Sequence, residues 1–234
     1  NLPLDPSDAE LAAAAAEKLQ LDVAAIREIR LFKRSHDDQK KSTIRLIYQL
    51  DVVLEPALER KFLAERAQGA DVGPSPDTSY HFVARASAGF PAQAQQRPLV
   101  IGFGPCGILA ALLLAQMGLK PIVLERGRDV RQRTRDTWGL WRQRRLQTES
   151  NVQFGEGGAG TFSDGKLYSQ VRDRRHLGRK VLTEFVQAGA PAEILTEAKP
   201  HIGTFKLVKM VENIRAEIIR LGGEIRFEQK VTGL

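Results

Sequence analysis

The chain has 234 residues, of which 42% are hydrophobic and 27% are charged, and its formal net charge is +7. This balance is ordinary for a globular protein and argues against disorder, and the length allows one large domain or two modest ones. The single cysteine, Cys106, excludes an internal disulfide and any paired-cysteine metal or redox site, so we predict no metal centre and favour a reducing, cytoplasmic compartment.

The first 85 residues have the pattern of a small α+β domain. Ser7 and Glu10 have the spacing of a capping box ahead of an alanine-rich run, which predicts a helix, and alternating apolar residues on both sides of a charged turn predict an antiparallel strand pair. The expected elements are a strand at 2–4, a helix at 7–18, strands at 26–33 and 43–54, a helix at 55–67 and a strand at 80–84. This βαββαβ order is ferredoxin-like.

A connection separates this domain from the rest of the chain. Residues 68–97 are rich in Gly, Pro, Ala and Gln, so we expect domains at 1–85 and 98–234 with a linker at 86–97. Residues 1–97 carry 13 basic and 14 acidic side chains, whereas the remainder carries 22 and 14, which places the basic excess in the second domain. The apolar run at 108–117 is about half the roughly twenty residues that cross a bilayer, so we expect a core helix and no membrane contact.

The second domain opens with a nucleotide-binding pattern. An apolar strand at 98–103 runs into the glycine motif at 102–107, which precedes the apolar helix, a second strand at 121–124 and Glu125. Gly102 permits a tight turn, Gly104 lets backbone amides approach a pyrophosphate, and Gly107 allows the helix to pack on the strand. The fold class predicted is therefore α/β, with a Rossmann-like domain.

Glu125 stands where a carboxylate accepts hydrogen bonds from ribose hydroxyls. A 2′-phosphate would be repelled there, so FAD or NAD is favoured over NADP. The alternative is that the glycines serve only a turn and a packed helix. Cys106 is expected to be a small buried residue on the first helical turn rather than a redox thiol.

Residues 129–145 combine arginines with two tryptophans on an expected helix. One interpretation is a solvated face with Trp138 and Trp141 in the core, another is a lining for an anionic substrate or phosphate, and a third is a nucleic-acid patch. The arginines are Arg131, Arg133, Arg135, Arg142, Arg144 and Arg145.

A second glycine loop, NVQFGEGGAGTFSDGKL, occupies residues 151–167. Its glycines alternate with fixed polar residues, unlike a Gly/Ser spacer. Gly157, Gly158 and Gly160 would let successive amides point at an anionic or electron-rich edge. A functional loop is favoured over a plain surface turn.

The motifs LPLDPSDAEL, RPLVIGFGPCGILAALLLAQMGLKPIVLERG and ESNVQFGEGGAGTFSDGKL, with GAPAEILTEAKPHIGT and IIRLGGEIRFEQKV, run through nearly the whole chain. On these residues the chain resembles the uncharacterised FAD-dependent dehydrogenases, bacterial proteins of the broad glutathione-reductase-like class. Related flavoproteins usually carry Ala where this chain has Cys106.

The resemblance implies an FAD-dependent oxidoreductase whose nucleotide domain is incomplete at the C-terminus of this chain. FAD would place its pyrophosphate over the first glycine motif, its ribose on Glu125, its flavin near 155–163 and its adenine near Val231. The implied cofactor-binding residues are Gly102, Gly104, Pro105, Cys106, Gly107, Glu125, Arg126, Gly157, Gly158, Gly160, Thr161, Ser163 and Val231.

The expected chemistry is that of the flavin, with NAD(P)H as a candidate electron donor and an anionic small molecule as a candidate substrate. His201 could donate to a substrate, although a structural histidine is favoured. Lys166, with Arg172, Arg174 and Arg175, could hold an anion or form a solvated face. The other readings are a nucleic-acid-binding module, which the balanced charge of residues 1–97 argues against, and a dinucleotide sensor without redox chemistry.

Overall fold

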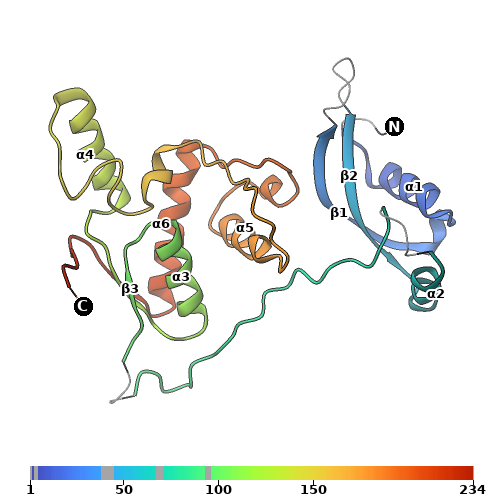
Figure 1. Ribbon diagram of the computed structural model, residues 1–234, viewed down its shortest axis with the longest axis horizontal. Helices are drawn as coiled ribbons and strands as arrows, with labels where there is room; N and C mark the ends of the chain where they lie inside the picture. Colours follow the sequence, from blue (N-terminus) through green and yellow to red (C-terminus); the bar gives the residue numbers. More distant parts are fainter. Residues whose placement is uncertain (1, 3–4, 38–44, 67–70, 93–95, 234) are drawn as a thin grey trace. The chain divides into compact units, whose positions relative to one another are not determined.

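The computed structural model describes residues 2, 5–37, 45–66, 71–92 and 96–233 (Figure 1). The fold is mixed α/β with two small sheets. The chain forms two compact units, one of residues 1–78 with 195–200 and one of residues 79–194 with 201–234. Each unit is described by itself below.

The first unit has two helices and an antiparallel strand pair. Its elements are α1 (Asp8–Leu19), β1 (Ile26–Asp37), β2 (Arg45–Leu54) and α2 (Pro56–Arg66), with a short 3-10 turn at Val23–Ala25. The capping box is present, because the Glu10 amide donates to Ser7 Oγ at 3.3 Å and the Ser7 amide donates to Glu10 Oε2 at 2.8 Å. Both predicted helices and the predicted strand pair are confirmed here.

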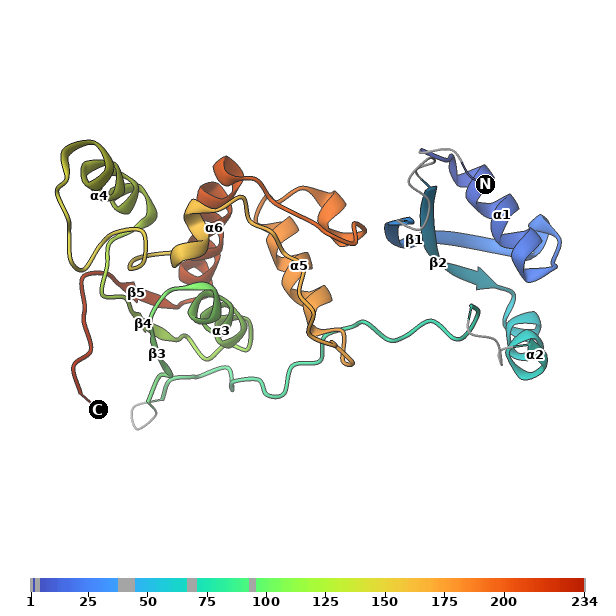
Figure 2. The ribbon, with the colours of Figure 1, turned by 45° about the horizontal axis from the view of Figure 1, so that its top comes forward.

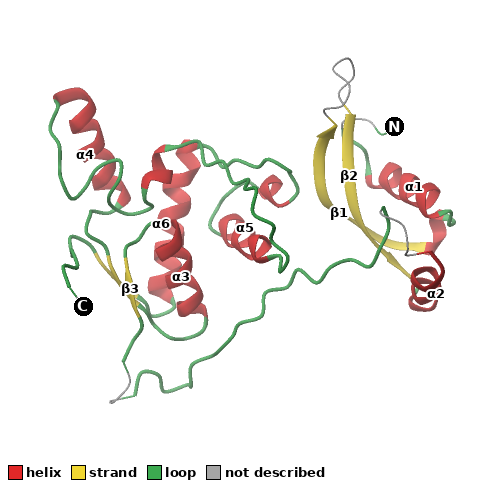
Figure 3. Ribbon diagram, viewed as in Figure 1, coloured by secondary structure: helices red, strands yellow, loops and turns green. Residues whose placement is uncertain are grey.

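The ferredoxin-like order is only partly seen, because the described residues of this unit contribute two of its four strands. The expected strand at 80–84 is wrong, and the expected strand at 2–4 lies mostly outside the described residues. The alternating aromatic residues at 80–84 make side-chain contacts instead of pairing in a sheet. The Tyr80 and Phe82 rings meet edge to face, with 5.1 Å between their centroids. Figure 3 shows the described parts of residues 71–98 as loop.

A segment distant in sequence, residues 196–198, lies along β1. The Arg34 amide donates to the Thr196 carbonyl at 2.7 Å, and the Ala198 amide donates to the Arg34 carbonyl at 2.9 Å. The side chains of Arg34 and Glu197 form an ion pair. Nothing in the sequence pattern indicated this contact, which satisfies backbone groups that an edge strand would leave open.

The second unit contains a three-stranded parallel sheet in the order β3-β4-β5 (Figure 2). Its strands are β3 (Leu99–Ile101), β4 (Ile122–Leu124) and β5 (Glu224–Arg226), and its helices are α3 (Pro105–Gln116), α4 (Val130–Gln143), α5 (Leu177–Gln187) and α6 (Thr204–Arg220). Two 3-10 turns, Ala159–Phe162 and Ala192–Leu195, complete the list. Helices α3 and α6 pack side by side, and the core fills the space around them with Phe103, Leu112, Val123, Ile214 and Ile218.

The strand, helix, strand order predicted from residue 98 onward is confirmed. Gly118 follows α3 with φ of +80°, the left-handed geometry expected after a helix C-terminus. Helix α5 was not predicted. In the described part of the chain, no helix has the length and apolar character needed to cross a membrane.

Candidate ligand-binding site

A cavity of about 330 Å³ lies at the carboxyl ends of the three parallel strands. Ile101 and Gly102 reach it from β3, Leu124 and Glu125 reach it from β4, and residues 229–231 reach it just beyond β5. In open α/β sheets, ligands bind in the crevice outside this edge. The volume is at the low end of the range for ligand pockets.

The first glycine motif has the backbone geometry that its sequence implies. Gly102 has φ of +92°, which favours glycine, and it turns the chain from β3 toward α3. A Cβ atom on Gly107 would stand 2.0 Å from the Gly102 carbonyl oxygen, so only glycine lets α3 begin this close to the strand. Gly104 is the N-cap of α3 and offers no side-chain acceptor to the first amides of the helix. Such amides are suited to an anion.

The second glycine loop packs directly on the first. The Gly157 amide donates to the Phe103 carbonyl at 2.8 Å. A Cβ atom on Gly158 would lie 3.2 Å from Gly104 Cα and 3.0 Å from Pro105 Cδ, and Gly158 also has φ of +64°. The second glycine loop therefore forms a wall of the cavity next to the turn after β3.

Glu125 is 4% exposed and is held by the backbone on both sides. Its Oε2 atom accepts from the Phe103 amide at 2.7 Å, and its Oε1 atom accepts from the Gly127 amide at 2.8 Å. Each carboxylate oxygen has a further lone pair, so a carboxylate fixed in this way can still accept from a ligand hydroxyl. The residue lines the cavity at the end of β4, where the sequence placed it.

Cationic side chains flank the rim of the cavity. The Arg126 guanidinium lies over the Phe154 ring, 3.8 Å from its centroid, and donates to Glu149 Oε2 at 2.7 Å. Lys230 donates to the other oxygen of Glu149 at 3.1 Å. Arg126, Phe154 and Lys230 all line the cavity.

The structure brings some predicted site residues together and leaves others apart. Those that line the cavity are Gly102, Gly104, Glu125, Arg126, Gly158 and Val231. Those that do not are Pro105, Cys106, Gly107, Gly157, Gly160, Thr161 and Ser163. Gly107 and Gly157 instead shape the turns behind the cavity wall.

Two of these residues differ from what their pattern predicts. Cys106 is exposed, because it lies on the outer side of the first turn of α3, so the expectation of a buried cysteine is wrong. Thr161 is 2% exposed, and its hydroxyl lies within the packed loop, where Arg133 donates to it at 3.4 Å.

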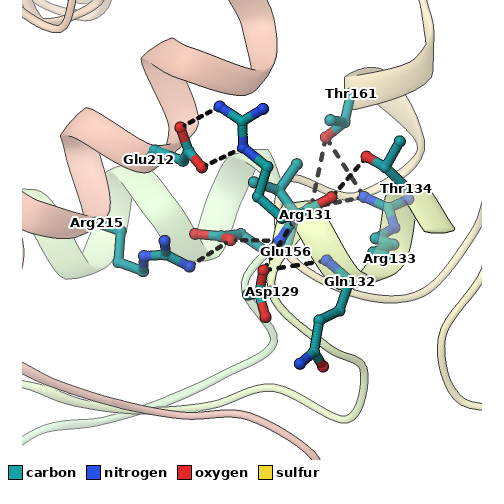
Figure 4. Close-up of polar contacts among 10 residues, drawn as sticks. Asp129, Arg131, Gln132, Arg133, Thr134, Glu156, Thr161, Glu212 and Arg215 are labelled. Atoms are coloured by element: carbon teal, nitrogen blue, oxygen red, sulfur yellow. Dashed lines mark hydrogen bonds and ion pairs between the residues drawn. The ribbon is translucent and has the colours of Figure 1, made fainter. Parts of the chain in front are cut away.

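The arginine-rich helix α4 does not match the interpretation of a solvated face with buried tryptophans. Trp138 and Trp141 are 46% and 61% exposed, whereas Arg133 has no exposed surface. The tryptophans lie on the outer side of a helix whose inner side is occupied by Arg133 and Thr137. Arg131 pairs with Glu212 of α6, with its Nε atom 2.6 Å from Oε1 (Figure 4).

Glu156 is a buried carboxylate at the centre of this region (Figure 4). Its Oε2 atom accepts from the Val130 amide at 2.7 Å and from Arg215 Nη1 at 2.8 Å. Its Oε1 atom is buried and has no hydrogen-bond partner among the described residues. Burial raises the pKa of Glu156 to about 7, because the hydrogen bond from the Val130 amide and the Arg215 cation offset the effect of burial only in part. The carboxylates of Asp129 and Glu212 raise this pKa by smaller amounts.

This pKa predicts a pH-dependent contribution to stability. The folded state binds a proton at Glu156 up to about pH 7, whereas an unfolded glutamate loses it near pH 4.5. The free energy of unfolding therefore falls between these pH values and levels off above pH 7. The fall is at most about 1.4 kcal/mol for each unit by which folding raises the pKa. Because glutamine cannot ionise and resembles the protonated carboxyl, urea titrations are expected to show the wild type losing stability relative to Glu156→Gln between pH 5 and pH 8, and an equal difference at both pH values would contradict the shift.

The remaining candidates lie away from the cavity. Lys166 and His201 are exposed and pair through an antiparallel backbone bridge. Lys166 Nζ lies 3.5 Å from Asp164 Oδ2. Arg172, Arg174 and Arg175 are exposed, which fits the solvated-face reading. None of these residues lines the cavity.

Sequence reasoning missed several residues that the fold brings to the site. Gln153, Phe154, Gln229 and Lys230 line the cavity from two segments that are about 75 positions apart in the chain. Gln153 and Phe154 directly precede Gly155 in the second glycine loop, and nothing in their residue type indicates a binding role. Gly127 is the residue whose role the sequence could best have indicated, because it is a glycine directly after Glu125 and Arg126. A Cβ atom at this position would lie 2.5 Å from Gly155 Cα, so only glycine leaves room for the second glycine loop.

Comparison with known proteins gives a relative without an assigned function. No family model matches the chain. The chain is 43% identical over 231 residues to an uncharacterized protein of Clostridium beijerinckii. The match covers 99% of this chain and 42% of the relative, so the chain spans less than half the length of the curated relative that it matches.

Proposed function

We propose that the second unit is the first part of a Rossmann-like FAD-binding domain and that the protein is an FAD-dependent oxidoreductase. The observation that carries the proposal is the single cavity where Gly102 and Gly104, Glu125 and Gly158 meet. The β3-β4-β5 order supports it, because it equals one half of the dinucleotide-binding order 3-2-1-4-5-6.

The residues present fit the adenosine and pyrophosphate part of FAD. Glu125 would accept from the ribose hydroxyls, and the amides that begin α3 at Gly104 would face the pyrophosphate. The backbone at Val231 would border the adenine, beside the Phe154 ring. Bound FAD would supply the redox chemistry, while these residues bind and orient its adenosine end.

A ligand titration tests the proposal. We expect quenching of FAD fluorescence to saturate on addition of the protein, and we expect ADP to compete because it carries the adenosine diphosphate part. FMN, which has the flavin without adenosine, is expected to compete poorly. Absence of saturable FAD binding, or competition by FMN but not by ADP, would overturn the assignment.

A second measurement separates an oxidoreductase from a sensor of dinucleotides. The absorbance of the bound flavin near 450 nm is followed after anaerobic addition of NADH or NADPH, and bleaching is expected for a redox enzyme. A flavin that binds but is reduced no faster than free FAD would support the sensor instead.

A further inference from the structure

Arg133 is fully buried, and its guanidinium binds three carbonyl groups of the second glycine loop. Nε donates to the Asn151 carbonyl at 2.7 Å, Nη2 to the Val152 carbonyl at 2.7 Å and Nη1 to the Glu156 carbonyl at 2.6 Å. The loop thus bends around one side chain of α4. Figure 4 shows Arg133 beside Thr161, which lies within the 3-10 turn Ala159–Phe162 that follows.

The carbonyls that Arg133 binds belong to residues just before and just after the cavity-lining segment in sequence. Gln153, Phe154 and Gly155 line the cavity, and the carbonyls at 151, 152 and 156 flank them in sequence. A planar guanidinium has donors in a fixed fork and can join these groups. An ammonium group donates from a single nitrogen and cannot reach all three in the same way.

The loop is shaped to accept this side chain. A Cβ atom on Gly155 would stand 2.5 Å from Arg133 Cδ, and Gly155 has φ of +117°. The Phe162 ring lies against the guanidinium, 4.8 Å from centroid to Cζ. A glycine at 155 is therefore explained by Arg133 and by backbone conformation together.

A general contribution to stability does not explain an arginine at this position. Burial lowers the pKa of Arg133 to about 10, so the side chain is still charged at neutral pH. A buried cation carries a desolvation cost that an apolar side chain of similar volume would avoid, and such replacements are often neutral or stabilising. What an apolar side chain could not do is fix the three carbonyls.

We propose that Arg133 is a positioning residue that holds the Gln153–Gly155 wall in the conformation that binds the adenosine end of the ligand. This inference rests on the proposed dinucleotide site. The fraction of molecules with a competent loop enters the apparent Kd directly, so a tenfold fall in that fraction raises the apparent Kd about tenfold.

The test compares Arg133→Lys and Arg133→Met with the wild-type chain. Arg135→Met is the matched control, because Arg135 is an exposed arginine on the same helix. Two quantities are measured: the Kd for FAD, and hydrogen exchange of residues 151–158 without ligand. Exchange in α3 and α6 and the far-UV circular dichroism report on the rest of the unit.

We expect both Arg133 variants to raise the Kd for FAD at least about tenfold and to speed exchange in 151–158, while α3 and α6 keep their protection. Arg135→Met is expected to change neither quantity. Faster exchange over the whole unit, with an unchanged Kd at temperatures where the variants are folded, would overturn the positioning role.

Two further outcomes keep the inference separate from the proposed function. If the wild type binds no FAD but loop exchange still responds to Arg133 alone, the proposed function fails and the part of the inference that concerns loop order stands. If neither Arg133 variant folds, hydrogen exchange of the wild type is the test. The Glu156 and Gly157 amides donate to the Arg128 and Phe103 carbonyls, so an ordered loop requires that they exchange slowly. Rapid exchange of these amides would overturn the inference.

Discussion

Replacing Gly107 by alanine is expected to abolish FAD binding and to destabilise the second unit by several kcal/mol. In an ordinary helix the same change is stabilising by up to about 1 kcal/mol, because alanine has the higher helix propensity. Here the added Cβ would stand 2.0 Å from the Gly102 carbonyl oxygen and 3.0 Å from the Gly102 carbonyl carbon. Both atoms belong to the backbone, so α3 must move away from β3, and the turn that lines the cavity moves with it.

Thermal unfolding and FAD titration of Gly107→Ala check this expectation. The control is Gly139→Ala, also at a helical glycine, where an added Cβ would meet its nearest atom, the Arg145 carbonyl oxygen, at 4.0 Å. That variant is expected to unfold at the wild-type temperature or slightly above it and to retain FAD affinity. Equal behaviour of the two alanine variants would show that the close approach of α3 and β3 is not present.

Replacing Glu125 by alanine is expected to lower both stability and FAD affinity. The Phe103 and Gly127 amides would lose a charged acceptor, and each such hydrogen bond contributes about 1.5–3 kcal/mol. The proposed hydrogen bonds to the ribose would be lost as well, which predicts a rise in the Kd for FAD of roughly tenfold or more.

Urea unfolding and FAD titration at a temperature well below the unfolding transition separate the two effects. Glu228→Ala is the control, because Glu228 is an exposed carboxylate that pairs with Arg128 at the surface, where an ion pair contributes about 0–1 kcal/mol. A destabilised Glu125→Ala protein that still binds FAD with wild-type affinity would remove the ribose role while keeping the structural one. Unchanged stability would contradict the two backbone hydrogen bonds.

Phe103 connects the three parts of the proposed site. Its amide donates to Glu125, its carbonyl accepts from Gly157, and its ring is fully buried. The turn after β3, the carboxylate after β4 and the second glycine loop therefore share one backbone residue. A disturbance of any of them is expected to reach the others, which is why the Gly107, Glu125 and Arg133 variants all have FAD affinity as a readout.

The sequence by itself determined the local features of this protein. The capping box at Ser7 and Glu10, the strand pair, and the order of strand, glycine motif, helix, strand and Glu125 each lie within a stretch of about 30 residues or fewer, and the structure has each of them. Gly107 is an example: its role follows from the spacing of the motif, because the same few residues form both the turn and the first turn of the helix.

The tertiary structure alone decided which distant residues meet. The alternation at Tyr80 and Phe82 resembled a strand, but a strand needs a partner in the sheet, and the chain placed residues 195–200 beside β1 instead. The same applies to Arg133, which has the sequence context of a surface arginine and is buried because the loop of residues 151–156 folds over it. Local pattern fixes backbone conformation, whereas burial and hydrogen-bond partners depend on which segments pack together, and that choice is made by the whole chain.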